Sequence, residues 1–287
     1  MKPKNLGTKI FLDSGSAEGT REILKLIGFL DGQTTNPTYF AKSPEVQKRL
    51  EEKGKFTKQD LLDKYKDTVR KISEMIPDGS VSIEVYADKN TKAEEMLVQA
   101  KEMYKWIPNA HIKFPTIPEG LKAAHEAVVL GIRVNMTIVF QQEQAAAVYA
   151  ATKGAAPGQV FVSPFIGRHY DNGDDGIEFV KNIIHMYKQG DGHVEVLAAS
   201  LRSLHQFYVC VHMGVDIITA GKKWIEAWHE DGLKVPSDTF QYKPENLKSI
   251  PYQELSLNKP FDTYDLDHPL AASALDQFAD DWNNLIE

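Results

Sequence analysis

The sequence predicts an α/β protein, a (β/α)8 TIM barrel with extra helices between strands two and three and a C-terminal helical tail. Eight short apolar runs rich in β-branched residues recur along the chain, and segments with helical periodicity separate them. No glycine-rich dinucleotide-binding turn follows the first run. Strands that alternate with helices form a parallel sheet, and eight rounds within about 220 residues fit a closed barrel better than an open sheet.

The predicted strands cover residues 9–13, 30–36, 81–86, 111–114, 133–140, 159–165, 193–200 and 215–219, and the helices between them cover 17–27, 91–106, 118–129, 142–152, 174–188 and 201–213. Residues 38–76 interrupt this rhythm with two charged helical patterns, one starting at Ser43-Pro44 and one over 58–76. Residues 236–260 are polar and rich in turn residues, and a terminal helix follows over 271–286. We therefore expect a single domain over 1–287, with the barrel over 8–222 and a C-terminal extension over 223–287.

Composition excludes several classes of partner. A net charge of −7 opposes binding to nucleic acid, because phosphate contacts require a concentrated basic face. No run approaches the roughly 18 apolar residues that a membrane span needs. The single cysteine, Cys210, excludes an intrachain disulfide, and the histidines show no HExxH or comparable metal-binding spacing. We expect a soluble, cytoplasmic protein without a metal site, binding neither nucleic acid nor membrane.

Polar residues at the ends of the predicted strands are the candidates for chemistry, since reactive groups of a barrel project from the C-terminal strand ends. They are Asp13, Asn36, Glu84, Lys113, Asn135, Thr137, Ser163, Arg168, Ser200 and Arg202, and Phe165 lies between Ser163 and Arg168 in the sequence. Lys113 is the most informative, because a barrel strand is covered on both faces and a buried ammonium group is costly. Burial lowers the pKa of an amine, and a neutral amine is what attack on a carbonyl requires, so the location suggests Schiff-base chemistry. A structural ion pair with Glu84, or a side chain that reaches solvent from the strand end, is the alternative.

Two carboxylates and two arginines accompany the lysine. Asp13 and Glu84 could divide the roles of base and proton shuttle if their environments differ, and a helix cap or an ion pair is the alternative. Arg168 and Arg202 follow strands six and seven, where barrel loops often hold a phosphate group. Guanidinium groups suit phosphate because their donors fork across two oxygens. A surface ion pair, for example with Asp171, is the alternative for either arginine.

Seven short motifs at strand ends, taken in order, resemble those of the transaldolase family from strand one through strand eight. Each is modest by itself, but their common order is hard to produce by chance. The motifs are Phe11-Leu12-Asp13, Thr34-Thr35-Asn36-Pro37, Ile83-Glu84-Val85, Ile112-Lys113-Phe114-Pro115, Asn135-Met136-Thr137, Ser163-Pro164-Phe165-Ile166-Gly167-Arg168 and Ala199-Ser200-Leu201-Arg202.

The resemblance implies transfer of a dihydroxyacetone unit between sugar phosphates through a lysine Schiff base, without metal or organic cofactor. The donor would be sedoheptulose 7-phosphate or fructose 6-phosphate. Lys113 would attack the ketone, Glu84 and Thr137 would move protons through a bound water, and Asp13 would deprotonate the C4 hydroxyl. The resemblance also implies substrate-binding residues: Asn36, Asn135 and Ser163 for the donor's hydroxyls and the imine, and Arg168, Ser200 and Arg202 for the phosphate.

Two positions bear on transfer as opposed to release of free dihydroxyacetone. Glu84 stands where the related fructose 6-phosphate aldolases are expected to have glutamine, and Phe165 where they are expected to have tyrosine. Glu84 and Phe165 both favour transfer. For Phe165 the physical reason is that phenylalanine cannot donate a proton near the enamine. A dihydroxyacetone-releasing aldolase, a transaldolase acting on another sugar, and a non-catalytic sugar-phosphate-binding barrel remain the alternatives.

The C-terminal region departs from the family. Residues 219–223 lack the usual proline-leucine continuation, and residues 233–270 have no clear counterpart. Residues 278–282 nevertheless resemble the terminal helix of small, ring-forming members, in which this helix reaches a neighbouring subunit. We therefore expect a homo-oligomer, with the tail packed over the barrel or on a neighbour.

Overall fold

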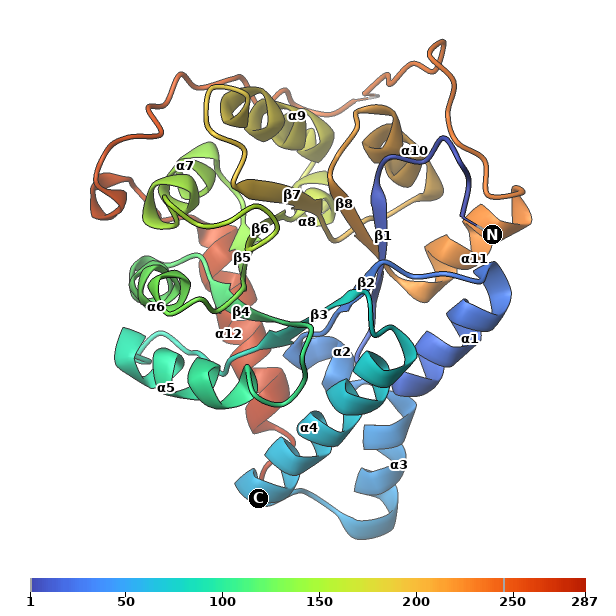
Figure 1. Cartoon of the computed structure of the whole chain (residues 1–287), viewed down its shortest axis with the longest axis vertical. Helices are drawn as coiled ribbons and strands as arrows, with labels where there is room; N and C mark the ends of the chain where they lie inside the picture. The colour runs from blue at the N-terminus through green and yellow to red at the C-terminus, as the bar shows by residue number, and fades with distance from the viewer. Residues whose placement is uncertain (1, 245) are drawn as a thin grey trace.

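Eight parallel strands close into a barrel in the order of the sequence, and helices surround it (Figure 1). The structure is a computed structural model that describes residues 2–244 and 246–287. The barrel closes where β1 pairs with both β2 and β8. The strands are β1 (Lys9–Asp13), β2 (Gly32–Thr34), β3 (Ser80–Glu84), β4 (Ala110–Pro115), β5 (Val134–Val139), β6 (Val160–Pro164), β7 (Val194–Ala198) and β8 (Ile217–Ala220). The predicted fold class is confirmed.

The helices that connect the strands follow the predicted segments with small shifts at their ends. They are α1 (Ala17–Ile27), α5 (Ala93–Met103), α6 (Pro118–Val129), α7 (Gln142–Ala151), α8 (Ile166–Asp171), α9 (Gly176–Tyr187), α10 (Leu204–His212) and α11 (Lys222–Glu230). The short helix α8 is an addition, and it ends before Asp175, whose carboxylate caps α9 by accepting from the amides of Ile177 and Glu178. Helix α11 follows β8 and begins at residue 222, so the last helix of the βα rhythm extends past the expected end of the barrel at that residue.

Extra helices lie between β2 and β3, as predicted, but there are three of them instead of two. They are α2 (Pro37–Ala41), α3 (Pro44–Lys53) and α4 (Lys58–Met75). Asn36 begins the additional helix, since its side chain accepts a hydrogen bond from Tyr39 N at 2.8 Å and proline occupies the first helical position. Ser43 caps α3 in the same way, with Pro44 next to it. The helix start predicted at Ser43-Pro44 is confirmed, and α2 is the helix that the prediction lacked.

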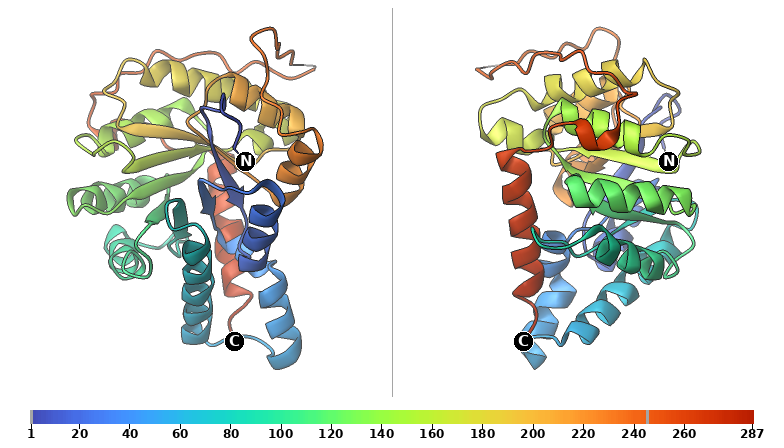
Figure 2. Two further views of the ribbon diagram at one scale, coloured as in Figure 1. Left: turned by 45° about the vertical axis from the view of Figure 1, so that its right-hand side comes forward. Right: turned by 90° about the vertical axis from the view of Figure 1, so that its left-hand side faces the viewer.

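The terminal helix α12 (Pro269–Asn283) runs across one end of the chain's own barrel (Figure 2). It packs mainly on α2, where Trp282 stacks on Phe40 with ring centroids 5.9 Å apart. Beyond the helix, Phe56 N donates to Leu285 O at 2.8 Å, which ties the end of the chain to the segment between α3 and α4. The tail thus covers its own barrel, and the expected homo-oligomer stays a prediction. None of the helices within residues 2–244 and 246–287 is both long and apolar enough to cross a lipid bilayer.

Candidate active site

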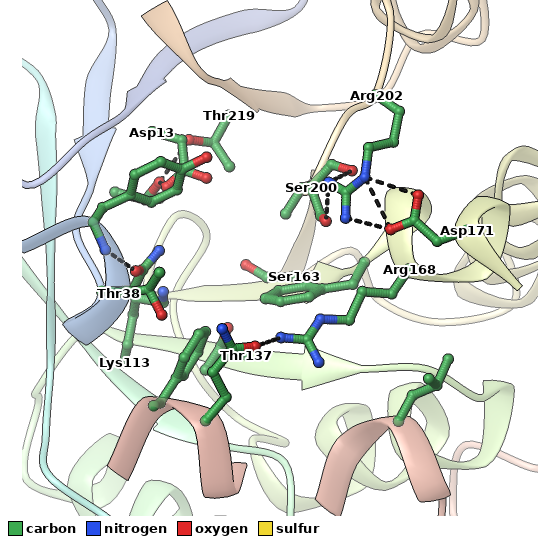
Figure 3. A pocket seen from close by; sticks show the side chains of 18 of the residues that line it. Asp13, Thr38, Lys113, Thr137, Ser163, Arg168, Asp171, Ser200, Arg202 and Thr219 are labelled. Carbon is green, nitrogen blue, oxygen red and sulfur yellow. Dashed lines mark hydrogen bonds and ion pairs between the residues drawn. The ribbon is translucent and has the colours of Figure 1, made fainter. Parts of the chain in front are cut away.

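A pocket of about 470 Å³ opens at the C-terminal ends of the strands, beneath α12. It contains most of the predicted site residues, which come from four strands, β1, β4, β5 and β6, and from the segments that follow β2, β6 and β7 (Figure 3). These are Asp13, Asn36, Lys113, Thr137, Ser163, Phe165, Arg168, Ser200 and Arg202. Glu84 and Asn135 do not line this pocket, and both lie beside Lys113, as its register partners on β3 and β5.

The amine of Lys113 is buried and paired. Its side chain is 4% exposed, and Nζ lies 2.8 Å from Glu84 Oε2 and donates to Thr35 O at 3.2 Å. Glu84 Oε2 is close enough to Lys113 Nζ to form an ion pair. In the part of the chain that the structure describes, this oxygen accepts no hydrogen bond of good geometry. Burial raises the pKa of Glu84, and the charge of Lys113 opposes that rise. The pair expected as the structural alternative is therefore present, and it places a carboxyl able to hold a proton next to the amine.

Asp13 ends β1 on the rim of the same pocket. Thr34 Oγ1 donates to Asp13 Oδ1 at 2.8 Å and shares a hydrogen bond of 2.6 Å with Thr219 Oγ1. Burial raises the pKa of Asp13, while the charge of Lys113 and the hydrogen bond from Thr34 lower it. A carboxylate that is desolvated in this way is a stronger base than one in water.

The interior polar residues form a layer beside the lysine. Asn135 donates from Nδ2 to Ser82 Oγ at 3.0 Å and accepts from Ser163 Oγ at 2.7 Å, and both Asn135 and Ser163 are buried. Thr137 differs, because its buried Oγ1 has no hydrogen-bond partner in the part of the chain that the structure describes. A buried hydroxyl that lines a pocket without a protein partner is suited to bind a water or a ligand atom.

Two guanidinium groups occupy the side of the pocket opposite Asp13 and Lys113 (Figure 3). Arg202 forks onto the carboxylate of Asp171, with Nη2 at 2.7 Å from Oδ2, and its Nη1 donates to Ser200 Oγ at 3.1 Å. Arg168 donates from Nη2 to Gln277 Oε1 at 2.8 Å. Burial and the charge of Arg202 lower the pKa of Arg168, since two cations lie close together. Such a pair favours an anionic ligand.

A close approach of α8 and the loop after β7 sets these arginines in place. A Cβ on Gly167 would lie 2.0 Å from Ser200 O and 2.7 Å from Arg202 Nη1, so only glycine fits there. Ser200 itself has φ of 64°, in the left-handed region that non-glycine residues rarely adopt. Strain of this kind clusters at functional sites, because the surrounding structure must hold it.

Several pocket residues escaped the sequence reasoning. Tyr39 on α2 lines the mouth, and the charge of Asp13 is the main cause of its raised pKa. Leu270, Gln277 and Phe278 come from α12. Tyr39 follows the Thr34–Pro37 motif and could have been considered on that ground. The residues of α12 carry no such signal, because only the return of the tail brings them to the pocket.

A buried amine between two carboxyls, with paired guanidiniums across one pocket at the C-terminal rim of a barrel, is the arrangement of a (β/α)8-barrel enzyme. The model of the transaldolase/fructose-6-phosphate aldolase family matches residues 10–287. The chain therefore belongs to this family and is a transaldolase-type enzyme.

Curated relatives agree over most of the chain. A probable transaldolase of Syntrophomonas wolfei is 33% identical over 274 residues, covering 96% of this chain and 98% of the relative. A probable transaldolase of Dehalococcoides mccartyi is 37% identical over 194 residues, covering 68% of this chain and 77% of the relative. A probable transaldolase of Parabacteroides distasonis is 38% identical over 211 residues, covering 74% of this chain and 85% of the relative. The family resemblance read from the strand-end motifs is confirmed.

Proposed function

We propose that the protein transfers a dihydroxyacetone unit from a ketose phosphate, sedoheptulose 7-phosphate or fructose 6-phosphate, to an aldose phosphate through a Schiff base on Lys113. The observation that carries this proposal is the buried amine of Lys113, held 2.8 Å from Glu84 at the pocket floor. The names of the curated relatives, probable transaldolases, support the same reaction.

The first stage forms the imine. Glu84 takes the proton of the Lys113 ammonium, because burial raises the pKa of this carboxyl and the two groups are in contact. The neutral amine attacks the ketone carbon, so that a C–N bond forms while the C=O π pair moves onto the oxygen. A proton of the attacking nitrogen then passes to that oxygen and gives a carbinolamine. Glu84 then returns its proton, through a water bound at the free hydroxyl of Thr137, to the departing hydroxide, and the imine forms with loss of one water.

The second stage breaks a carbon–carbon bond. Asp13 removes the proton of the C4 hydroxyl, the C3–C4 bond breaks, and its electron pair moves into the protonated imine, which leaves an enamine on Lys113. The first aldose phosphate departs, an acceptor aldehyde enters, and the steps run in reverse. No metal or organic cofactor is required, because the protonated imine is the electron sink.

Binding of the remote phosphate positions the reacting end. Arg168, Ser200 and Arg202 lie across the pocket from Lys113 and offer charge-assisted hydrogen bonds to a phosphate. Asn36 and Ser163 line the same pocket, where they would hold the donor's hydroxyls, and Asn135 would act through its hydrogen bond with Ser163. Binding energy from the phosphate thereby contributes to orientation at the ketone.

Borohydride trapping tests the Schiff base. Incubation with fructose 6-phosphate and borohydride should add the mass of the reduced adduct to Lys113, located by peptide mass spectrometry, and Lys113→Arg should abolish it because arginine stays charged. An adduct elsewhere, or an active Lys113→Arg enzyme, would remove the proposal.

Measurement of free dihydroxyacetone separates transfer from release. We expect little without an acceptor and rapid consumption of fructose 6-phosphate once erythrose 4-phosphate is added, because Phe165 lines the pocket and cannot donate a proton to the enamine. Phe165→Tyr should raise the acceptor-independent release. Release by the unaltered protein at the same rate with and without acceptor would instead identify an aldolase.

A further inference from the structure

Gln144, the third residue of α7, has a fully buried side chain whose amide is saturated with hydrogen bonds. Its Oε1 accepts from the backbone amides of Phe140 at 2.7 Å and Gln141 at 3.2 Å. Its Nε2 donates to the carbonyls of Thr116 at 2.8 Å and Ile138 at 3.2 Å. A carboxamide offers two donor protons and two acceptor sites, so all of its capacity is spent on backbone groups.

These backbone groups belong to the ends of the two strands that carry Lys113 and Thr137. Thr116 directly follows β4, and it donates to Thr137 O both from its amide at 2.9 Å and from Oγ1 at 2.8 Å. Ile138 follows Thr137 on β5. The amide of Gln144 therefore joins the ends of β4 and β5 around the backbone of Thr137.

The backbone around Thr137 is irregular and strained. The β5–β6 register shifts between Met136 and Val139, and Ile138 has φ of 55°. For a β-branched residue this conformation is costly and persists only where the surroundings impose it. No hydrogen bond from the described residues fixes Thr137 Oγ1, so the position of this hydroxyl depends on the backbone that carries it and on the side-chain rotamer.

We infer that Gln144 is a positioning residue for imine formation: it holds the bulge of β5 in the shape that directs the Thr137 hydroxyl toward the carbon bound to Lys113. Gln144 is fully buried and does not line the pocket, so it would act only through Thr137. The inference rests on the proposed function, in which Thr137 holds the water that carries the proton.

Gln144→Met tests the inference, because methionine has a similar length and no amide. Gln142→Met is the matched control, since Gln142 lies on the same helix, is 2% exposed, and spends its amide on Pro251 O and Gln253 N of the C-terminal segment. We expect Gln144→Met to lower both kcat and the rate of borohydride trapping at saturating fructose 6-phosphate by about tenfold or more, since small misplacements of a reacting group are costly. The donor KM should change by less than about twofold, and Gln142→Met should alter none of these values by more.

A double mutant separates positioning from a general structural role. Gln144→Met added to Thr137→Val should cause little further loss of trapping rate, because the first residue acts through the second. Thr116→Val is a milder second variant that removes only one donor to Thr137 O, and it should slow trapping without raising KM. Full additivity, or trapping by Gln144→Met and Thr116→Val as fast as by Gln142→Met, would overturn the inference.

The two proposals fail in different ways. If the unaltered protein forms no adduct on Lys113, the proposed function fails. If it forms the adduct at the same rate as Gln144→Met, the proposed function stands and only the role of Gln144 is wrong.

Discussion

Lys113 Nζ and Glu84 Oε2 lie 2.8 Å apart across the β3–β4 ladder, and both side chains are at most 5% exposed. In an ion pair so far from water, the cost of desolvating the two charges is offset by their mutual attraction. Removing one partner leaves the charge of the other buried and unpaired. The same contact therefore connects stability with chemistry.

Glu84→Gln should lower the free energy of unfolding by roughly 3 kcal/mol, because the Lys113 ammonium loses its counter-ion in a buried site. Urea unfolding at neutral pH measures this change. The double variant Glu84→Gln/Lys113→Met should recover part of the loss, since no unpaired charge remains. Equal stability of Glu84→Gln and the unaltered protein would show that the pair does not exist as described.

Asp13→Asn should slow turnover by about 10²–10⁴-fold, as expected for loss of a general base, while imine trapping continues. The same change should raise Tm at neutral pH. Burial raises the pKa of Asp13 above its ordinary value of 3.8, so ionising it costs folding free energy at any pH above the value of the unfolded chain. The Tm difference should therefore grow as pH rises above about 4 and vanish below it. A difference that grows toward acid pH, or unchanged turnover, would contradict this role.

Arg202→Lys should raise the KM for phosphorylated donors about tenfold, because lysine cannot reproduce the fork that Arg202 presents. The free energy of unfolding should change by less than about 1 kcal/mol, since the Arg202 and Asp171 side chains are 38% and 51% exposed. Arg21→Lys, in the exposed pair of Arg21 with Glu18 on α1, is the matched control and should leave KM unchanged. Steady-state kinetics with fructose 6-phosphate decide the outcome, and an unaltered KM for Arg202→Lys would argue against phosphate binding there.

Tyr39→Phe should raise the KM for the acceptor by roughly three- to tenfold, the cost of one lost hydrogen bond. The charge of Asp13 raises the pKa of the Tyr39 hydroxyl above its ordinary value of 10, so the phenol keeps its proton and can donate it in a hydrogen bond. Tyr39 is 41% exposed, so thermal stability should stay unchanged. Tyr170→Phe, at a tyrosine of α8 that lies outside the pocket and is 48% exposed, provides the comparison. Identical acceptor kinetics of the two variants would exclude a role for the phenol.

The barrel and most of its rim could be predicted from the sequence because they depend on local pattern. Periodicity of 2 or 3.6 residues places the strands and helices, and the parallel closure then brings every strand end to one rim. Asp13, Lys113 and Thr137 were identified in this way, since each stands at or near the end of an apolar run. Helix α2 was missed, because Asn36 and Pro37 were read only as part of a site motif.

Tertiary structure alone decided which groups complete the pocket and what holds them. Gln277 and Arg168 are 109 residues apart in the chain, and nothing local to either of them indicates their hydrogen bond. It forms because α12 packs on α2 through Trp282 and Phe40, a contact whose free energy comes from apolar burial between distant segments. The hydrogen bonds from Gln144 to the ends of β4 and β5 also depend on long-range packing. They form only after the two strands and helix α7 have packed together. The sequence by itself thus determined the barrel, the lysine and its carboxylates, while long-range packing determined how the pocket is closed and how its geometry is held.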